Sequence, residues 1–167
     1  MIIVEPPSRG AARSKTRGGP AANKFSRTEL ARFLVRARLA AGLAGRVEVL
    51  LAGDETLARL NRDYRKKNVA TDVLSFPALV VPGHAARVAG DLAISIDTAA
   101  RQAEAQGHAL EDELKILILH GVLHLAGHDH ERDDGEMRRL EQRLRRTLGL
   151  PAGLIERAAK QRRGRRA

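Results

Sequence analysis

The residues best suited to chemistry are concentrated at 120–130, which contains four of the six histidines in the chain. His120 and His124 follow an almost wholly apolar run at 114–119, which has no glycine or proline and therefore predicts a buried helix. Residues four apart on a helix lie one turn apart on the same face, so both imidazoles should point the same way. Gly127 predicts the end of this helix, because glycine readily adopts the left-handed conformation found there.

A third imidazole can reach the same point if the chain turns back after the helix. His130 is favoured for this role, and His128 is the alternative. Three imidazoles with a fourth position left for water form a catalytic zinc site, whereas structural zinc sites are closed by four protein ligands. Hydrogen-bonded core histidines explain the spacing less well, because three polar rings are costly to bury without a shared partner. We therefore predict one zinc ion per chain, held by His120, His124 and His130.

The spacing also matches a long zinc-protease signature, H-E-x-x-H-x-x-G-x-x-H, at every position but one. The glutamate that acts as general base in those proteases is replaced by Gly121, which has no side chain. A metal cage without the peptidase base argues against a protease of that class.

Charge is unevenly distributed along the 167 residues, whose net charge is +10. Residues 1–24 carry +4 and residues 160–167 carry +5, which leaves +1 for the rest. Basic ends on a nearly neutral body indicate an anionic polymer as partner, although such arms also bind polyanions non-specifically. Aromatic residues make up only 2% of the chain, so a base-stacking platform like that of an RNA-recognition motif is not expected.

The absence of cysteine excludes disulfides and thiolate metal ligands, and leaves histidine and carboxylate as ligands. No apolar run approaches the roughly 20 residues that cross a bilayer, and no secretory signal is recognised at the N-terminus. These features favour a cytoplasmic protein without membrane contact.

The hydrophobic pattern predicts an α+β fold, with a small mixed β-sheet packed with helices and the metal site on a buried helix. Strands are expected at 2–5, 46–51, 73–76 and 91–96, and N-caps of helices at Ser26, Asp54, Asp97 and Asp134. We expect one domain at 1–159, which includes a flexible basic loop at 6–24 and is followed by a basic tail at 160–167. His108 is expected at the surface, in the loop before the metal helix.

Four blocks in fixed order resemble the YbeY family of bacterial endoribonucleases, also called rRNA maturation factors. They are residues 60–67 (LNRDYRKK), 71–77 (TDVLSFP), 90–95 (GDLAIS) and 120–130. The resemblance implies a zinc-dependent, single-strand-specific endoribonuclease that matures the 3′ end of small-subunit (16S) rRNA and takes part in ribosome quality control. The partners that it implies are single-stranded RNA, rRNA and the small ribosomal subunit.

By motif position, His120, His124 and His130 look like the three zinc ligands of that family. The sequence departs from the family at His128, where the family often has tyrosine. With glycine at the protease-base position, we expect Asp129 to orient a ligand histidine rather than to act as a base.

Arg65 looks like the active-site arginine of the family. Its guanidinium suits phosphate because it stays charged and donates two parallel hydrogen bonds. A cation at a helix C-terminus is also favourable for purely structural reasons. Lys67 and Thr71, from the same motifs, are expected to contact the substrate.

Two other functions remain open on the sequence. A metal-dependent protease or amide hydrolase could use the same cage, although Gly121 speaks against it. A non-catalytic ribosome-assembly factor could carry the metal as a structural element, in which case a fourth protein ligand is expected.

Overall fold

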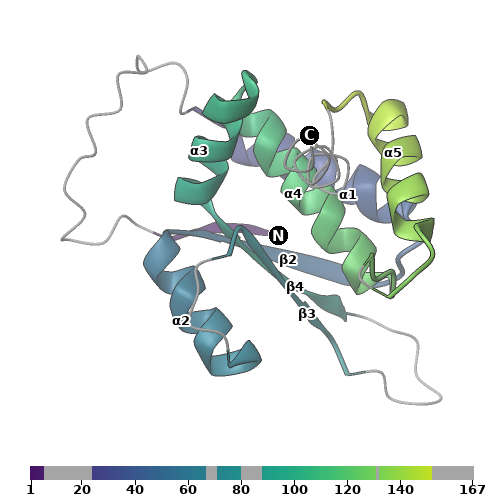
Figure 1. Ribbon diagram of the computed structural model, residues 1–167, viewed down its shortest axis with the longest axis horizontal. Helices are drawn as coiled ribbons and strands as arrows, with labels where there is room; N and C mark the ends of the chain where they lie inside the picture. Colours follow the sequence, from purple (N-terminus) through teal and green to yellow (C-terminus); the bar gives the residue numbers. More distant parts are fainter. Residues whose placement is uncertain (6–23, 67–70, 80–87, 131, 152–167) are drawn as a thin grey trace, which may run out of the picture.

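The computed structural model describes residues 1–5, 24–66, 71–79, 88–130 and 132–151 of the chain (Figure 1). Its elements are β1 (Ile2–Val4), α1 (Arg27–Ala40), β2 (Arg46–Ala52), α2 (Asp54–Arg65), β3 (Val73–Pro77), β4 (Val88–Ser95), α3 (Ile96–Gln106), α4 (Leu110–Leu125) and α5 (Glu136–Leu148). This order of elements is the predicted one. None of the helices in the described part has the length and apolar character needed to span a membrane. Residues 6–23 of the predicted basic loop and the basic tail at 160–167 lie outside the described residues.

The strands form one sheet in the order β1-β2-β4-β3. β2 pairs in parallel with both β1 and β4, whereas the edge strand β3 runs antiparallel to β4. The register places Val49 of β2 opposite Ile2 and Leu92, and places Leu92 opposite Ser75 of β3. The prediction of a mixed sheet is therefore confirmed.

Helices cover the two faces of the sheet unequally. α1, α3, α4 and α5 lie on one side, and α2 lies on the other (Figure 1). α4 is the central helix of the thicker layer, since it contacts α1, α3, α5 and the strands β3 and β4. Leu114 and every residue at 116–119 are buried, so the predicted buried helix is confirmed, although it begins at Leu110.

Apolar side chains enter two separate cores because strand residues alternate between the faces of the sheet. Leu92 and Ile94 of β4 belong to the larger core, which the sheet forms with α1, α4 and the other helices of that layer. Ala93, between them, belongs to a small core with Leu57 of α2 and Leu74 of β3. The small core holds α2 against the edge of the sheet.

The predicted N-cap Ser26 is confirmed, since its hydroxyl accepts a hydrogen bond from the backbone nitrogen of Glu29 at 3.3 Å. The other three predicted caps are wrong by one or two positions. The residues that cap α2, α3 and α5 are Gly53, Ser95 and Gly135, in place of Asp54, Asp97 and Asp134. A cap depends on where the first helical turn begins, and composition alone locates that turn only to within a few residues.

Side chains exchanged between α2 and α3 explain two of these differences. Asp97 accepts a hydrogen bond from the backbone nitrogen of Asp54 at 3.0 Å, so it serves the start of the other helix. Asp54 in turn accepts from the hydroxyls of Ser95 and Thr98 and from Arg101. Burial raises the pKa of Asp54, but these three donors outweigh it and hold the pKa below its usual value. The network ties the start of α2 to the start of α3.

Gly90 of β4 marks a close approach between the sheet and the end of α4. Its φ of +148° lies in a region that is essentially restricted to glycine. A Cβ atom there would lie 2.4 Å from the carbonyl oxygen of Phe76 and 2.8 Å from Cδ2 of Leu125. The glycine therefore lets β3, β4 and the C-terminal end of α4 meet.

Replacing Gly90 by alanine should strongly destabilise the protein. Overpacking and backbone strain each cost about 1–3 kcal/mol, so the free energy of unfolding should fall by about 2–6 kcal/mol. Gly107→Ala is the matched control, because Gly107 also has a positive φ of +70°, but a Cβ atom added there would meet no other atom within 4 Å. Its cost should be only about 1–2 kcal/mol. Urea unfolding measures the free energy of unfolding of both variants. Equal decreases would contradict the packing argument.

Candidate metal centre

The C-terminal half of α4 presents two histidines to one point. His120 and His124 lie one helical turn apart, and their Nε2 atoms are 3.1 Å from each other. Their ring centroids are 4.7 Å apart. Nitrogen ligands about 2.0–2.1 Å from a tetrahedral zinc ion are themselves about 3.3 Å apart. The spacing of these two nitrogens is therefore close to that of two ligands of one metal ion.

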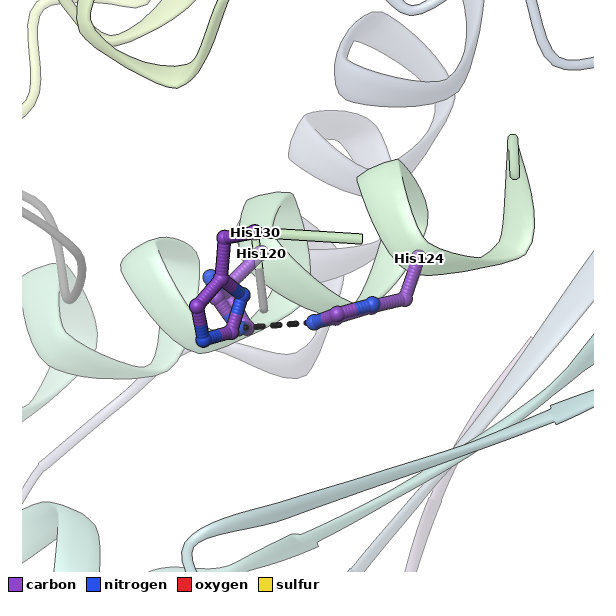
Figure 2. Close-up of side chains that lie close together, drawn as sticks. All are labelled: His120, His124 and His130. Carbon is purple, nitrogen blue, oxygen red and sulfur yellow. Dashed lines mark hydrogen bonds between the residues drawn. The ribbon is translucent and has the colours of Figure 1, made fainter. Parts of the chain in front are cut away.

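The turn after α4 brings in the third histidine. Gly127 has a φ of +91°, its backbone nitrogen donates to the carbonyl oxygen of His124, and that of His128 donates to Leu123. This pair of bonds is a Schellman motif, in which a glycine ends the helix and reverses the chain. The ring of His130 then lies beside those of the two helical histidines (Figure 2).

The three rings form a group that could hold a metal ion. One ligand atom from each of His120, His124 and His130 lies within 4.8 Å of the others. In the described part of the chain, His128 is not a member of this group. His120 is buried, His124 is half-buried and His130 is exposed, so the group opens towards solvent on one side. A donor set of three imidazoles with an open side fits a catalytic zinc ion.

The electrostatics of the group keep His124 in the form that binds metal. Burial lowers its pKa, the neighbouring His120, His130 and Arg65 lower it further to about 4, and Asp129 opposes them. His124 is therefore neutral at pH 7, and a neutral imidazole is the form that coordinates a metal. The effect of Arg65 on the pKa of His124 also indicates that the end of α2 lies near the three histidines.

A buried carboxylate of α5 supports the first histidine. Oε1 of Glu141 lies 3.2 Å from Nδ1 of His120, and the two side chains are 3% and 8% exposed. Metal-ligating histidines usually bind a carboxylate or carbonyl through their second nitrogen, which fixes the tautomer and the ring orientation. We predicted this kind of role for Asp129. Its Oδ2 lies 3.5 Å from Nε of Arg132, and its charge raises the pKa of His124.

Sequence reasoning missed Glu141, although a signal was present. It lies four residues after Met137 and three before Leu144, both of which are buried. This spacing places a glutamate on the buried face of an amphipathic helix, where a charged side chain needs a partner.

Replacing Glu141 by glutamine should weaken zinc binding about 10–100-fold, as is usual for such outer partners of a ligand. Glutamine keeps the size of the side chain but removes its charge. Glu136→Gln, at an exposed position of the same helix, is the control. Chelator competition measures the affinity, and an unchanged value in the Glu141 variant would show that this contact does not support the ligand.

Gly121 has a packing role as well as a chemical consequence. A Cβ atom at this position would lie 2.7 Å from Cδ2 of Leu92 in the sheet. The carbonyl oxygen of Gly121 also lies 3.4 Å from the hydroxyl of Ser75, which donates to it. The position that carries the base in zinc proteases is therefore pressed against β4 and β3 here, with no room for a glutamate.

The predicted substrate residues are only partly described. Arg65 is exposed and is the last residue of α2, which is ended by Lys66 in the left-handed conformation with a φ of +57°. Thr71 is half-buried just before β3, with its hydroxyl 3.4 Å from Oδ1 of Asp72. Lys67 lies outside the described residues. The roles of Arg65, Lys67 and Thr71 stay predictions.

His108 is not the surface residue that we expected. Its side chain is only 12% exposed, and its Nε2 lies 2.6 Å from the fully buried carboxylate of Glu113. The expectation is wrong because Glu113, on the buried face of α4, pairs with the ring of His108, although Gly107 and Ala109 on either side of it are exposed.

The fold and the site together define a class, an α+β protein in which three converging histidines could hold a metal ion. Comparison with known proteins then identifies the family. The family described as endoribonuclease YbeY matches residues 19–149, and this chain belongs to it.

Individual relatives agree with this assignment. The endoribonuclease YbeY of Koribacter versatilis is 58% identical over 135 residues, which cover 81% of this chain and 86% of the relative. That of Helicobacter pylori strain J99 is 45% identical over 127 residues, or 75% of this chain and 88% of the relative. The solution structure of TM1509 from Thermotoga maritima has a TM-score of 0.50 at 25% identity, and the match covers 86% of this chain and 85% of that one.

Proposed function

We propose that this chain is a zinc-dependent endoribonuclease that hydrolyses phosphodiester bonds of single-stranded RNA. Its membership of the endoribonuclease YbeY family supports the reaction. The convergence of three imidazoles is the observation that carries the metal dependence. We place the reaction in 3′-end maturation of small-subunit (16S) rRNA and in ribosome quality control, with the small ribosomal subunit as partner and the cytoplasm as location.

Each residue of the centre has its own task in this proposal. His120, His124 and His130 hold one zinc ion, which supplies Lewis acidity and activates water at neutral pH. Glu141 keeps His120 oriented towards the ion. Arg65 binds the scissile phosphate and stabilises the negative charge that develops in the transition state. The exposed side of His130 leaves the RNA access to the centre.

Charge supports a polyanionic substrate. The net charge of +10 arises largely from residues 1–24 and 160–167, which can contact phosphates beyond the cleavage site. Lys67 and Thr71, in the segment that joins α2 to β3, are proposed to contact the same strand close to Arg65.

The test is RNA cleavage by metal-free protein before and after zinc is added. Cleavage of a single-stranded oligonucleotide should return with zinc, while the same sequence in a perfect duplex and casein should stay intact. Cleavage of casein, or RNA cleavage that does not depend on metal, would overturn the proposal. Mapping of 16S rRNA 3′ ends in cells that lack the protein tests the biological role, where unprocessed ends are expected.

A further inference from the structure

An aromatic pair, made of the exposed Tyr64 and the partly buried Phe76, lies on the α2 side of the sheet edge. Tyr64, in the last turn of α2, is 69% exposed and directly precedes Arg65. Its ring lies 5.2 Å from that of Phe76 on the edge strand β3, with an angle of 70° between the ring planes. The chain contains four aromatic residues of the Phe and Tyr type, so two of them are gathered here.

Packing alone does not explain the exposure of Tyr64. It follows the buried residues Leu57 and Asn61 of α2 at helical spacing, so it lies on the stripe that faces the sheet. The small core ends with Phe76, however, and most of the tyrosine ring extends beyond it. An edge-to-face contact occupies at most one face of each ring, which leaves a face of Tyr64 free for a further partner.

The edge strand β3 links the pair to α4, the helix that carries two of the three histidines. Ser75, next to Phe76 on β3, donates to the carbonyl oxygen of Gly121 on α4. The carbonyl of Phe76 itself approaches Leu125, the neighbour of His124, at the position of Gly90. Because strand side chains alternate, Ser75 faces the metal helix while Phe76 faces α2. A strand of RNA that crosses the edge of the sheet at β3 therefore passes from the histidines to the tyrosine.

We propose that Tyr64, supported by Phe76, stacks on a nucleobase of single-stranded RNA next to the phosphate bound by Arg65. This inference rests on the proposed function and names a base-binding subsite for it. Stacking needs no particular base, since every base has a π-face. It does need an unpaired base, because both faces of a base inside a duplex are already covered. The subsite would thus select single strands near the cut, although the sequence has too few aromatics for an extended platform.

Binding in the presence of a chelator separates this subsite from metal chemistry. Fluorescence anisotropy should show that Tyr64→Leu weakens binding of a single-stranded oligonucleotide about 5–150-fold, the range expected for one stacked base. Leucine keeps an apolar contact with Phe76 but cannot stack in the same way. Tyr64→Phe, which retains the ring, should bind as the unaltered protein does. Zinc content and melting temperature should be the same in all three proteins.

Oligonucleotides with one abasic position assign the effect to a base. In a series of oligonucleotides with the abasic site at successive positions, one position should weaken binding to the unaltered protein. The Tyr64→Leu variant should be insensitive there, because the partner of that base is gone. Full affinity of the Tyr64→Leu variant for an intact strand would overturn the subsite while the endoribonuclease stands. Failure of the unaltered protein to bind or cleave any RNA would instead overturn the proposed function itself.

Discussion

Replacing His124 by alanine should abolish zinc binding and RNA cleavage together. His124 supplies one of the three converging imidazoles, and its Nε2 faces that of His120 at 3.1 Å. Loss of an outer partner already costs about 10–100-fold in metal affinity, so loss of a ligand should cost more than about 100-fold. The melting temperature should also stop rising when zinc is added, because zinc stabilises the folded protein only if it binds to it.

His128→Ala is the matched control, since it removes a histidine from the same turn but not from the group. This variant should keep its zinc, its melting temperature and its cleavage rate. Mass spectrometry of the native protein measures the zinc content, and thermal melts with and without zinc measure the stability. Cleavage of a labelled oligonucleotide measures the rate. Full zinc content and normal turnover in the His124 variant would remove His124 from the ligand set.

Replacing Arg65 by lysine should reduce kcat for RNA about 10²–10³-fold while zinc content and stability are retained. Removing one donor that stabilises transition-state charge commonly costs about 2.7–4 kcal/mol. Lysine keeps the positive charge but cannot make the two-pronged contact of a guanidinium with phosphate. If Arg65 served only the helix end, lysine would replace it with little loss, since any cation there is favourable.

Arg62→Lys provides the comparison, because Arg62 also lies in the last turn of α2 and is 56% exposed. Single-turnover cleavage under excess protein separates the chemical step from RNA binding in both variants. Near-normal cleavage by the Arg65 variant would leave the metal centre without this phosphate-binding partner. Equal losses in both variants would show that the effect is not specific to the position of Arg65, and would contradict a contact of Arg65 with the scissile phosphate.

The spacing of the histidines was sufficient to predict that three imidazoles converge, because the parts of this group are local. His120 and His124 are related by one helical turn, and the turn that presents His130 is specified by Gly127, so eleven consecutive residues bring the three rings together. The buried helix beneath them was predictable for the same reason, since an apolar run without helix breakers has few other folded states. The mixed sheet followed from the order of strands and helices.

Contacts between residues far apart in the chain were decided only by the tertiary structure. Glu141 meets His120 across 21 positions, and Ser75 meets Gly121 across 46, at distances that depend on how α5 and β3 pack against α4. The exposed Tyr64 meets the partly buried Phe76 because the small core ends at the edge strand, which composition could not reveal. The caps of α2 and α3 differ from the predicted ones for a related reason, since Asp54 and Asp97 each form hydrogen bonds with the start of the other helix. Local periodicity in the sequence predicts helices and strands and the histidines that they carry. Which distant residues contact those histidines depends on how the helices and strands pack.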